Sequence, residues 1–402
     1  MKNFNLKTLV ALLCVSALCG CGGSEKGNKP TANAETELEG VETSVMDLPV
    51  EKRLELAKKY EYMGRFDDGL ALVKMDGKRG FIDKSGKEVI PCVYDWAWDF
   101  SDGLALVKMD GKCGFIDKAG KQVIPYAYDG ADYFSDGLAL VRLNGKYGFI
   151  DKSGKEVIPC VYDLACGFSD GLAAFAMNGK WGFVDKSGKH VIPCVYNYAW
   201  DSSDGLARVA MNGKCGFIDK SGKQVIPCVY DAAWGFSDGL ARVVMNGKYG
   251  FIDKSGKQVI PCAYDGANEF SDGLAGVRLN GKYGFIDKSG KEVIPCVYDG
   301  VGTFSDGLAP VGLNGKCGFI DKAGKQVIPC VYDDARSFSD GLALVELNGK
   351  WGFIDKAGKQ LVPCVYDSVY ATAVDILVGT VKGSDGKETK YYYDKNGDFL
   401  GN

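Results

Sequence analysis

Histidine is nearly absent from this 402-residue sequence, in which His190 is the only one. Imidazole is the side chain that most often serves as a general base near neutral pH. A Ser-His-Asp or Cys-His catalytic site would therefore have to use His190. Equivalent positions elsewhere in the chain hold Glu88 and Gln122, which are typical of a solvated strand residue. The sequence thus predicts no enzymatic activity and no cofactor.

A strong net charge and long apolar runs are also missing. The formal charge is −4, and the lysines alternate with aspartates without forming a basic block, so nucleic acid is not expected as a partner. Proline is scarce (12 residues), whereas glycine (55), tyrosine (21) and phenylalanine (20) are abundant. This composition indicates a folded β protein with many turns.

The N-terminus has the form of an export signal. Lys2 and Lys7 flank a polar start, and an apolar run over 9–18 is too short to span a bilayer. The following Leu-Cys-Gly-Cys resembles the bacterial lipobox, which implies a signal peptide over 1–20 and lipidation of Cys21. A plain cleaved signal is the alternative. Lipidation would anchor the chain to a membrane of the cell envelope, with the outer membrane or the cell surface favoured.

Two further segments precede the main part of the chain. Residues 21–45 are polar and lack large apolar side chains, so they are expected to form a flexible tether. Residues 46–63 have Asp47 as a candidate N-cap and Val50, Leu54 and Ala57 at helical spacing, which predicts a short helical cap.

A 34-residue period governs the rest of the sequence. The motif Ser-Asp-Gly-Leu-Ala, with Asp67 in place of the serine in the first repeat, recurs without insertion, and its glycines are Gly69, Gly103, Gly137, Gly171, Gly205, Gly239, Gly273, Gly307 and Gly341. Nine repeats over 64–367 are therefore expected. Residues 368–402 contain a diverged copy, which is expected to act as a capping repeat.

Each repeat predicts three antiparallel strands in an all-β fold. Asp76-Gly77 lies between two short alternating runs and predicts a two-residue hairpin turn that pairs Val73 with Gly80. A third strand contains Pro91, which restricts it to an edge or a strand break. Because three strands fall short of the usual four-stranded propeller blade, we favour an elongated solenoid or superhelix. A closed, propeller-like toroid is the alternative.

The predicted hairpin has two faces that behave differently. Ala71, Val73, Gly80 and Ile82 lie on a face that hardly varies between repeats, as expected for a packed core. The other face and the aromatic-rich connector vary, which indicates either a ligand surface or solvent exposure. The candidate binding residues there are Trp96, Trp98, Tyr147, Trp181, Trp200, Arg208, Trp234, Arg242, Tyr249, Arg278, Tyr283 and Trp351.

Two segments carry a family resemblance. Trp181-Gly182-Phe183-Val184-Asp185-Lys186 and Trp351-Gly352-Phe353-Ile354-Asp355-Lys356 are similar to the WG (KWG) repeat of bacterial proteins, and the likeness extends over residues 60 to about 400. The sequence departs from the family pattern by keeping this tryptophan at only two of nine positions. The resemblance implies β-structured interaction modules without an established catalytic activity.

Cysteines recur at one position of most repeats, starting at Cys92, while Tyr126 takes that position in the second. Equivalent atoms of neighbouring repeats should lie too far apart for disulfides, and the spacing does not suit zinc. We expect free thiols and no metal site. The best candidates for an exception are the pairs Cys215 with Cys228 and Cys317 with Cys330.

Two function classes remain open. The first is an envelope-anchored binding module for an envelope or extracellular protein or for glycan and cell-wall material. The second is a passive envelope scaffold or spacer without a specific ligand.

Overall fold

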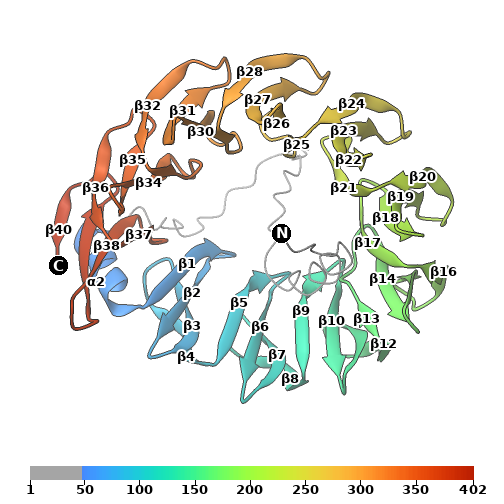
Figure 1. Cartoon of the computed structure of the whole chain (residues 1–402). Helices are drawn as coiled ribbons and strands as arrows, with labels where there is room; N and C mark the ends of the chain where they lie inside the picture. The colour runs from blue at the N-terminus through green and yellow to red at the C-terminus, as the bar shows by residue number, and fades with distance from the viewer. Residues whose placement is uncertain (1–47) are drawn as a thin grey trace, which may run out of the picture. The chain divides into compact units, whose positions relative to one another are not determined.

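A computed structural model describes residues 48–402, which form a ring of ten four-stranded antiparallel sheets, called blades 1 to 10 in chain order (Figure 1). The predicted signal peptide, tether and lipidated Cys21 lie outside the described residues. The predicted helical segment contains α2 (Val50–Lys59), which follows Pro49 and precedes blade 1.

The four strands of each blade run in order from the inside of the ring to its outer wall (Figure 1). The innermost strands are β1 (Tyr62–Asp67), β5 (Trp96–Ser101), β9 (Gly130–Ser135), β13 (Leu164–Ala165), β17 (Tyr198–Ser203), β21 (Ala232–Ser237), β25 (Gly266–Ala267), β29 (Gly300–Val301), β33 (Asp334–Ala335) and β37 (Ser368–Ala371). The second strands are β2 (Leu70–Met75), β6 (Leu104–Met109), β10 (Leu138–Leu143), β14 (Leu172–Met177), β18 (Leu206–Met211), β22 (Leu240–Met245), β26 (Leu274–Leu279), β30 (Leu308–Leu313), β34 (Leu342–Leu347) and β38 (Ile376–Lys382).

The third strands are β3 (Lys78–Asp83), β7 (Lys112–Asp117), β11 (Lys146–Asp151), β15 (Lys180–Asp185), β19 (Lys214–Asp219), β23 (Lys248–Asp253), β27 (Lys282–Asp287), β31 (Lys316–Asp321), β35 (Lys350–Asp355) and β39 (Glu388–Asp394). The outermost strands are β4 (Glu88–Tyr94), β8 (Gln122–Tyr128), β12 (Glu156–Tyr162), β16 (His190–Tyr196), β20 (Gln224–Tyr230), β24 (Gln258–Tyr264), β28 (Glu292–Tyr298), β32 (Gln326–Tyr332), β36 (Gln360–Tyr366) and β40 (Phe399–Gly401).

Local turn chemistry gives the hairpins the predicted register. Asp76 and Gly77 both have positive φ (51° and 77°), as a type I′ turn requires. Val73 is paired with Gly80, which confirms the predicted alignment of β2 with β3. In the next turn, the carboxylate of Asp83 accepts hydrogen bonds from the backbone N–H groups of Ser85 and Lys87. Ordinary turn chemistry therefore explains these acidic turn residues.

The all-β class is confirmed, and the arrangement is the closed toroid given as the alternative, not the elongated solenoid. The prediction and the structure differ because three strands were predicted for each repeat, whereas each blade has four. The connector after Tyr94 forms the innermost strand of the following blade, so each blade has four strands. That strand is short and interrupted by a register shift, for example between Ala97 and Phe100, and it therefore lacks a clear alternating pattern.

Both faces of each blade are buried against neighbouring blades. Leu72, Phe81 and Ile90 of blade 1 pack against Ala97 and Phe100 of blade 2, together with other apolar residues. The ring centroids of Phe81 and Phe100 lie 4.9 Å apart with an interplanar angle of 61°, and six other blade junctions repeat this pair with centroids 4.7 to 5.0 Å apart. The variable face predicted to be free is therefore largely interior, because a ring gives each blade two neighbours.

Ion pairs link neighbouring blades on both rims of the ring. On one rim, Lys112 of β7 lies 2.6 Å from Asp129, which leads into blade 3. On the other rim, Lys118 of blade 2 lies 3.4 Å from Asp68 of blade 1. These side chains are about half exposed, so each pair contributes at most about 1 kcal/mol. Apolar packing therefore dominates the cohesion between blades.

The ring closes where blade 1 meets blade 10. Met63, Val73 and Ile82 of blade 1 share a buried cluster with Ile376 and Val378 of β38. Helix α2 adds Leu56 and Ala57 to this cluster. The Arg53 side chain donates a hydrogen bond of 3.3 Å to the carbonyl oxygen of Val374. Residues from the two ends of the described chain therefore complete the ring.

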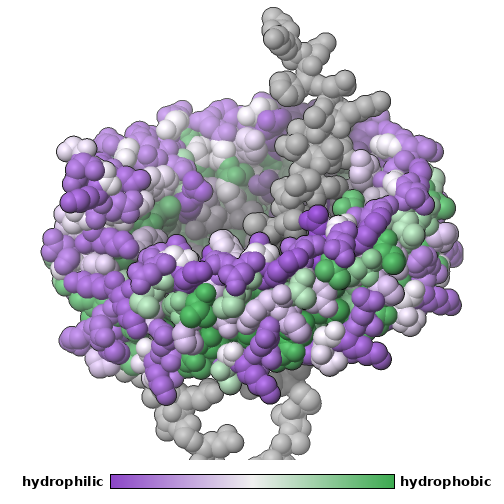
Figure 2. All heavy atoms as spheres, turned by 90° about the horizontal axis from the view of Figure 1, so that it is seen from below, coloured by the Kyte–Doolittle hydropathy of each residue, from purple (hydrophilic) through white to green (hydrophobic). Residues whose placement is uncertain are grey.

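The outer wall combines apolar and polar residues. Figure 2 shows hydrophobic residues over the wall of the blades at the bottom of Figure 1, with hydrophilic residues along both rims. Exposed valines of the outermost strands include Val93, Val161 and Val195. A proline such as Pro91 interrupts each of the first nine outermost strands, which disfavours edge-to-edge pairing. Within residues 48–402, no helix combines the length and the apolar character needed to cross a bilayer.

A glycine present in blades 1 to 9 allows β3 and β4, and their equivalents, to approach closely. In blade 5 this residue is Gly216, where a Cβ atom would lie 2.5 Å from the carbonyl oxygen of Ile226 and 2.7 Å from the backbone nitrogen of Cys228. Backbone atoms cannot move aside cheaply. The absence of a side chain at this position is therefore a steric requirement.

We predict that Gly216→Ala lowers the free energy of unfolding by about 1–3 kcal/mol, because the added methyl group overpacks the backbone of β20. Gly235→Ala is the matched control, since its Cβ would meet only Ser203 at 3.8 Å. Denaturant unfolding of both variants tests this. Equal stability of the two variants would contradict the steric explanation.

Candidate functional site

Arginine side chains lie over aromatic rings at several places around the ring. The guanidinium carbon is 4.0 Å from the ring centroid of Trp234 for Arg242, 3.9 Å from Trp200 for Arg208 and 3.4 Å from Trp96 for Arg79. Longer contacts of 5.8 to 5.9 Å join Arg142 to Tyr147, Arg278 to Tyr283 and Arg336 to Trp351. The arginines occupy different positions of the repeat, so an alignment of the repeats does not reveal that each of them contacts an aromatic ring.

Five of the twelve candidate residues line one groove between blades 6 and 7. The groove encloses about 290 Å³ and is lined by Trp234, Arg242 and Tyr249 of blade 6, by Arg278, Tyr283, Asn268, Ala267, Gly266 and Gly276 of blade 7, and by Asp265, which connects the two blades. Trp234 and Tyr249 stack with centroids 6.0 Å apart and an interplanar angle of 25°. We call this site the blade 6–7 groove.

A glycine makes the blade 6–7 groove hollow. Gly266 occupies the position of Tyr62, Trp96 and Tyr198 in other blades, and a Cβ on Gly266 would meet only the side chain of Arg278, with its Cβ at 3.6 Å and its Nε at 3.9 Å. Gly276 occupies the position of Leu72, but Val301 and Asn268 pack against it. Sequence reasoning missed these two glycines and Asn268, because it searched the variable face for large side chains. The loss of bulk at Gly266 is the signal that could have identified the groove.

Charges in the groove are held by specific partners. Arg242 donates a 2.7 Å hydrogen bond from Nη1 to the carbonyl oxygen of Ala267, and its Nη2 lies 3.6 Å from a carboxylate oxygen of Glu269. Burial lowers the pKa of Arg242, although an arginine stays protonated in proteins. A hydrogen bond from Lys248 at 2.5 Å holds the pKa of Asp265 below its usual value.

Arg278 is the less engaged of the two arginines. Its Nη2 donates one long hydrogen bond of 3.5 Å to the carbonyl oxygen of Asp265. Among residues 48–402, no carboxylate lies within 4.0 Å of its guanidinium nitrogens. The Nε atoms of Arg242 and Arg278 are buried and have no hydrogen-bond partner in this part of the chain. Because these Nε atoms are buried, the donors that a ligand in the groove could meet are the Nη–H groups of Arg278.

The other seven candidate residues lie elsewhere in the ring. Trp96 and Trp98 are exposed on β5. In blade 5, Arg208 lies over the ring of Trp200, as Arg242 lies over Trp234 in blade 6. Arg208 also donates a hydrogen bond to the carbonyl oxygen of Ala233 in blade 6. The remaining residues are half-buried on the third strands of blades 3, 4 and 9, namely Tyr147, Trp181 and Trp351. These residues form no single patch.

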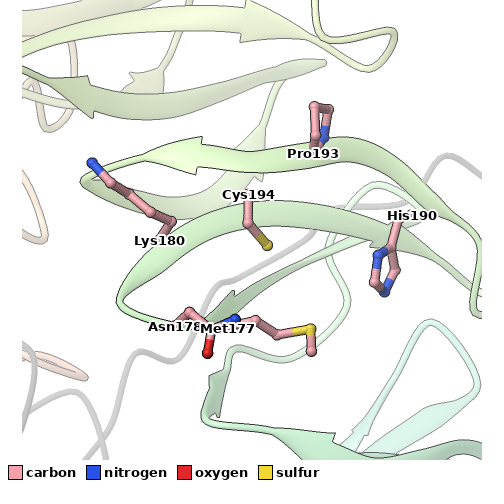
Figure 3. Close-up of a pocket in the computed structure, with 6 residues that line it drawn as sticks. All are labelled: Met177, Asn178, Lys180, His190, Pro193 and Cys194. Carbon is pink, nitrogen blue, oxygen red and sulfur yellow. The ribbon is translucent and has the colours of Figure 1, made fainter.

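A second cavity, of about 410 Å³, surrounds the only histidine. It is lined by Met177, Asn178, Lys180, His190, Pro193 and Cys194. Figure 3 shows His190 and Lys180 near opposite ends, with Cys194 between them. The Nε2 atom of His190 lies 3.1 Å from the hydroxyl of Tyr162, and its ring packs 4.4 Å from Phe175. These contacts describe a histidine held by packing and by one phenol.

Blade 4 also breaks the repeated ion pair. Asn197 occupies the position that is aspartate after the other blades, so Lys180 faces an amide where Lys146 has Asp163 at 2.5 Å. In the described part of the chain, no ion pair is formed by Lys180. Asn197 still accepts the backbone hydrogen bond from Asn212, at 3.0 Å. The turn is therefore preserved although the charge pair is lost.

No cysteine in residues 48–402 forms a disulfide bond. The pair Cys215 and Cys228 points to opposite sides of blade 5, since Cys215 packs toward blade 6 and Cys228 toward blade 4. Cys317 and Cys330 are separated in the same way in blade 8. The two candidate disulfides are therefore wrong, because side chains on opposite faces of a sheet cannot join. In the same residues, no three His, Cys, Asp or Glu side chains converge as metal ligands.

We predict that the thiol of Cys92 reacts slowly. Burial raises its pKa to about 11, because a thiolate is poorly solvated there. At pH 8 about one thiol in a thousand is then ionised, and the reactive fraction rises tenfold with each pH unit up to about 11. Iodoacetamide labelling followed by peptide mass spectrometry measures this. Labelling of Cys92 at pH 8 as fast in the folded as in the unfolded chain would contradict the prediction.

Comparison with known protein families decides the affiliation of the chain. The model of the WG containing repeat matches ten successive segments, 54–78, 80–113, 114–147, 147–181, 181–215, 216–249, 249–283, 283–317, 318–351 and 351–372. The chain belongs to the WG-repeat family. This confirms the resemblance, and it identifies the ring as a repeat protein of the β-propeller type, an architecture of binding and scaffold proteins. No curated protein matches the WG-repeat chain in sequence.

Solved structures show distant likeness to the WG-repeat ring. A eukaryotic initiation factor is 11% identical over 75% of this chain and 95% of its own, with a TM-score of 0.45. The extracellular domain of a putative hybrid two-component system from B. thetaiotaomicron is 10% identical over 83% of this chain and 63% of its own, with a TM-score of 0.27.

Proposed function

We propose that this WG-repeat protein is a non-enzymatic binding module, anchored to the cell envelope through Cys21, that presents the blade 6–7 groove to an envelope or extracellular protein or glycan. The membrane anchor rests on the lipobox-like sequence. The convergence of Trp234, Arg242, Tyr249, Arg278 and Tyr283 on one groove is the observation that carries the proposal. Aromatic and arginine side chains are the groups that most often dominate binding energy.

Two physical points support a ligand site in this groove. Within residues 48–402, Arg278 donates one long hydrogen bond of 3.5 Å and forms no ion pair, so its guanidinium group can still pair with an acceptor of a ligand. The half-buried aromatic side chains of Trp234 and Tyr249 provide apolar contact area in the same groove.

The test is retention of envelope material by the immobilised full chain. Trp234→Asn and Arg242→Ala, combined, insert the residues found at the equivalent positions of blades 7 and 4, Asn268 and Ala174. We expect the unmodified chain to retain a solubilised envelope protein or a purified envelope glycan, and the double variant to lose at least nine-tenths of it.

Leu164→Ala is the matched control, because Leu164 is an exposed apolar residue on the innermost strand of blade 4 and the equivalent position of blade 6 is Ala232. This variant should retain the ligand, and all proteins should unfold at similar temperatures. The alternative function, a passive envelope spacer, predicts that the unmodified chain retains neither class of material. That outcome would overturn the proposal.

A further inference from the structure

We propose that the blade 6–7 groove binds a sugar residue that carries a carboxylate group, with Arg278 as the principal ligand of the carboxylate. This inference rests on the proposed function and specifies its ligand class. It depends on the guanidinium group of Arg278, which has one long hydrogen bond, on the aromatic lining and on the small size of the groove.

The donors in the groove suit a planar oxyanion. The two Nη–H groups at the end of a guanidinium group match the two oxygens of a carboxylate. The one hydrogen bond that Arg278 donates within residues 48–402, from Nη2 to the carbonyl oxygen of Asp265, is long at 3.5 Å. Arg242 adds a second positive charge, although Glu269 partly balances it. A carboxylate in the groove would supply an acceptor for the Nη–H groups of Arg278.

The lining of the groove also suits a saccharide. Tyr249 and Tyr283 provide ring surfaces and phenolic hydroxyls, and the Asn268 side chain provides both a donor and an acceptor. Sugar rings combine apolar C–H faces with hydroxyl groups that need both kinds of hydrogen-bonding partner. The aromatic and amide side chains therefore match the neutral part of the ligand, and the arginines match its charge.

The dimensions of the groove argue against an extended peptide. A volume of about 290 Å³ lies near the lower limit for small-molecule pockets, which favours a single compact unit. A peptide that adds a strand to a sheet needs an edge of several residues. The innermost strand at this groove, β25, contains only Gly266 and Ala267. Binding of a short acidic peptide is therefore the outcome that the structure disfavours.

The repeat supplies a matched control for Arg278. Arg142 occupies the same position in blade 3, is paired directly with Tyr147 and lies 5.8 Å from its ring, compared with 5.9 Å for Arg278 and Tyr283. Arg142 is exposed, and Leu140 fills the position where blade 7 has Gly276. The two arginines share their local geometry, and only Arg278 borders the groove.

The experiment titrates the full chain with trigalacturonic acid and with its methyl ester, which removes the charge and keeps the sugar. We expect the acid to bind at least tenfold more tightly than the ester. Arg278→Gln should weaken binding of the acid about tenfold or more, to the level of the ester, because a charge-assisted hydrogen bond is lost. Arg142→Gln should leave both affinities within twofold of the unmodified chain.

A second variant tests the cavity without changing its charge. Gly266→Tyr places the tyrosine of blades 1 and 5 in the groove, where the backbone has room for a side chain. It should abolish binding of trigalacturonic acid and leave the unfolding temperature unchanged. Full binding by this variant would overturn the assignment of the site.

Three further results would overturn the inference. They are equal binding of acid and ester, equal effects of Arg278→Gln and Arg142→Gln, and binding of triglutamate as tight as that of trigalacturonic acid. The proposed function fails separately, when the immobilised chain retains no envelope protein or glycan. If envelope material is retained and is lost in the Trp234→Asn and Arg242→Ala variant while acid and ester bind equally, the binding function stands and only the ligand class is wrong.

Discussion

Burial of both faces of every sheet between two neighbours is the constraint on which this structure depends. A blade of four short strands has too little chain to cover its own apolar faces, so residues such as Phe81 and Ile90 need the next blade. An open row would leave a bare face at each end. The ring gives all ten blades two neighbours, and the shared cluster of blade 1, blade 10 and α2 completes it.

This constraint explains why side chains can vary at an interior position. Leu72 faces the small Ala97 in the first junction, whereas Gly276 of blade 7 faces Val301, whose Cγ2 would lie 3.0 Å from an added Cβ. A smaller side chain on one blade is therefore compensated by a larger side chain on the next blade. Sequence reasoning equated variation with exposure, and it could not recognise compensation between residues 25 positions apart without knowing that their blades touch.

The sequence predicted what depends on local chemistry. The Asp-Gly and Asn-Gly turns, the register of Val73 with Gly80 and the close approach at Gly80 all follow from residues that are near one another in the chain. Ring closure and the fourth strand could not be predicted in this way. The directions in which the side chains of Trp234 and Arg278 point depend on a register shift in β21 and on the two-residue strand β25. Sequence reasoning therefore named five residues of the groove, but it did not predict that they lie together.

Covalent coupling across the closing junction tests the ring most directly. Arg65 of blade 1 forms an ion pair with Asp340, which precedes β34 of blade 9. In an Arg65→Lys variant, a zero-length carbodiimide should join residues 65 and 340, as it should join Lys112 and Asp129, which lie 2.6 Å apart. In an open row with sheets about 10 Å apart, residues 65 and 340 would be separated by about 80 Å. Coupling of Lys112 to Asp129 without any 65–340 product, measured by mass spectrometry, would contradict closure.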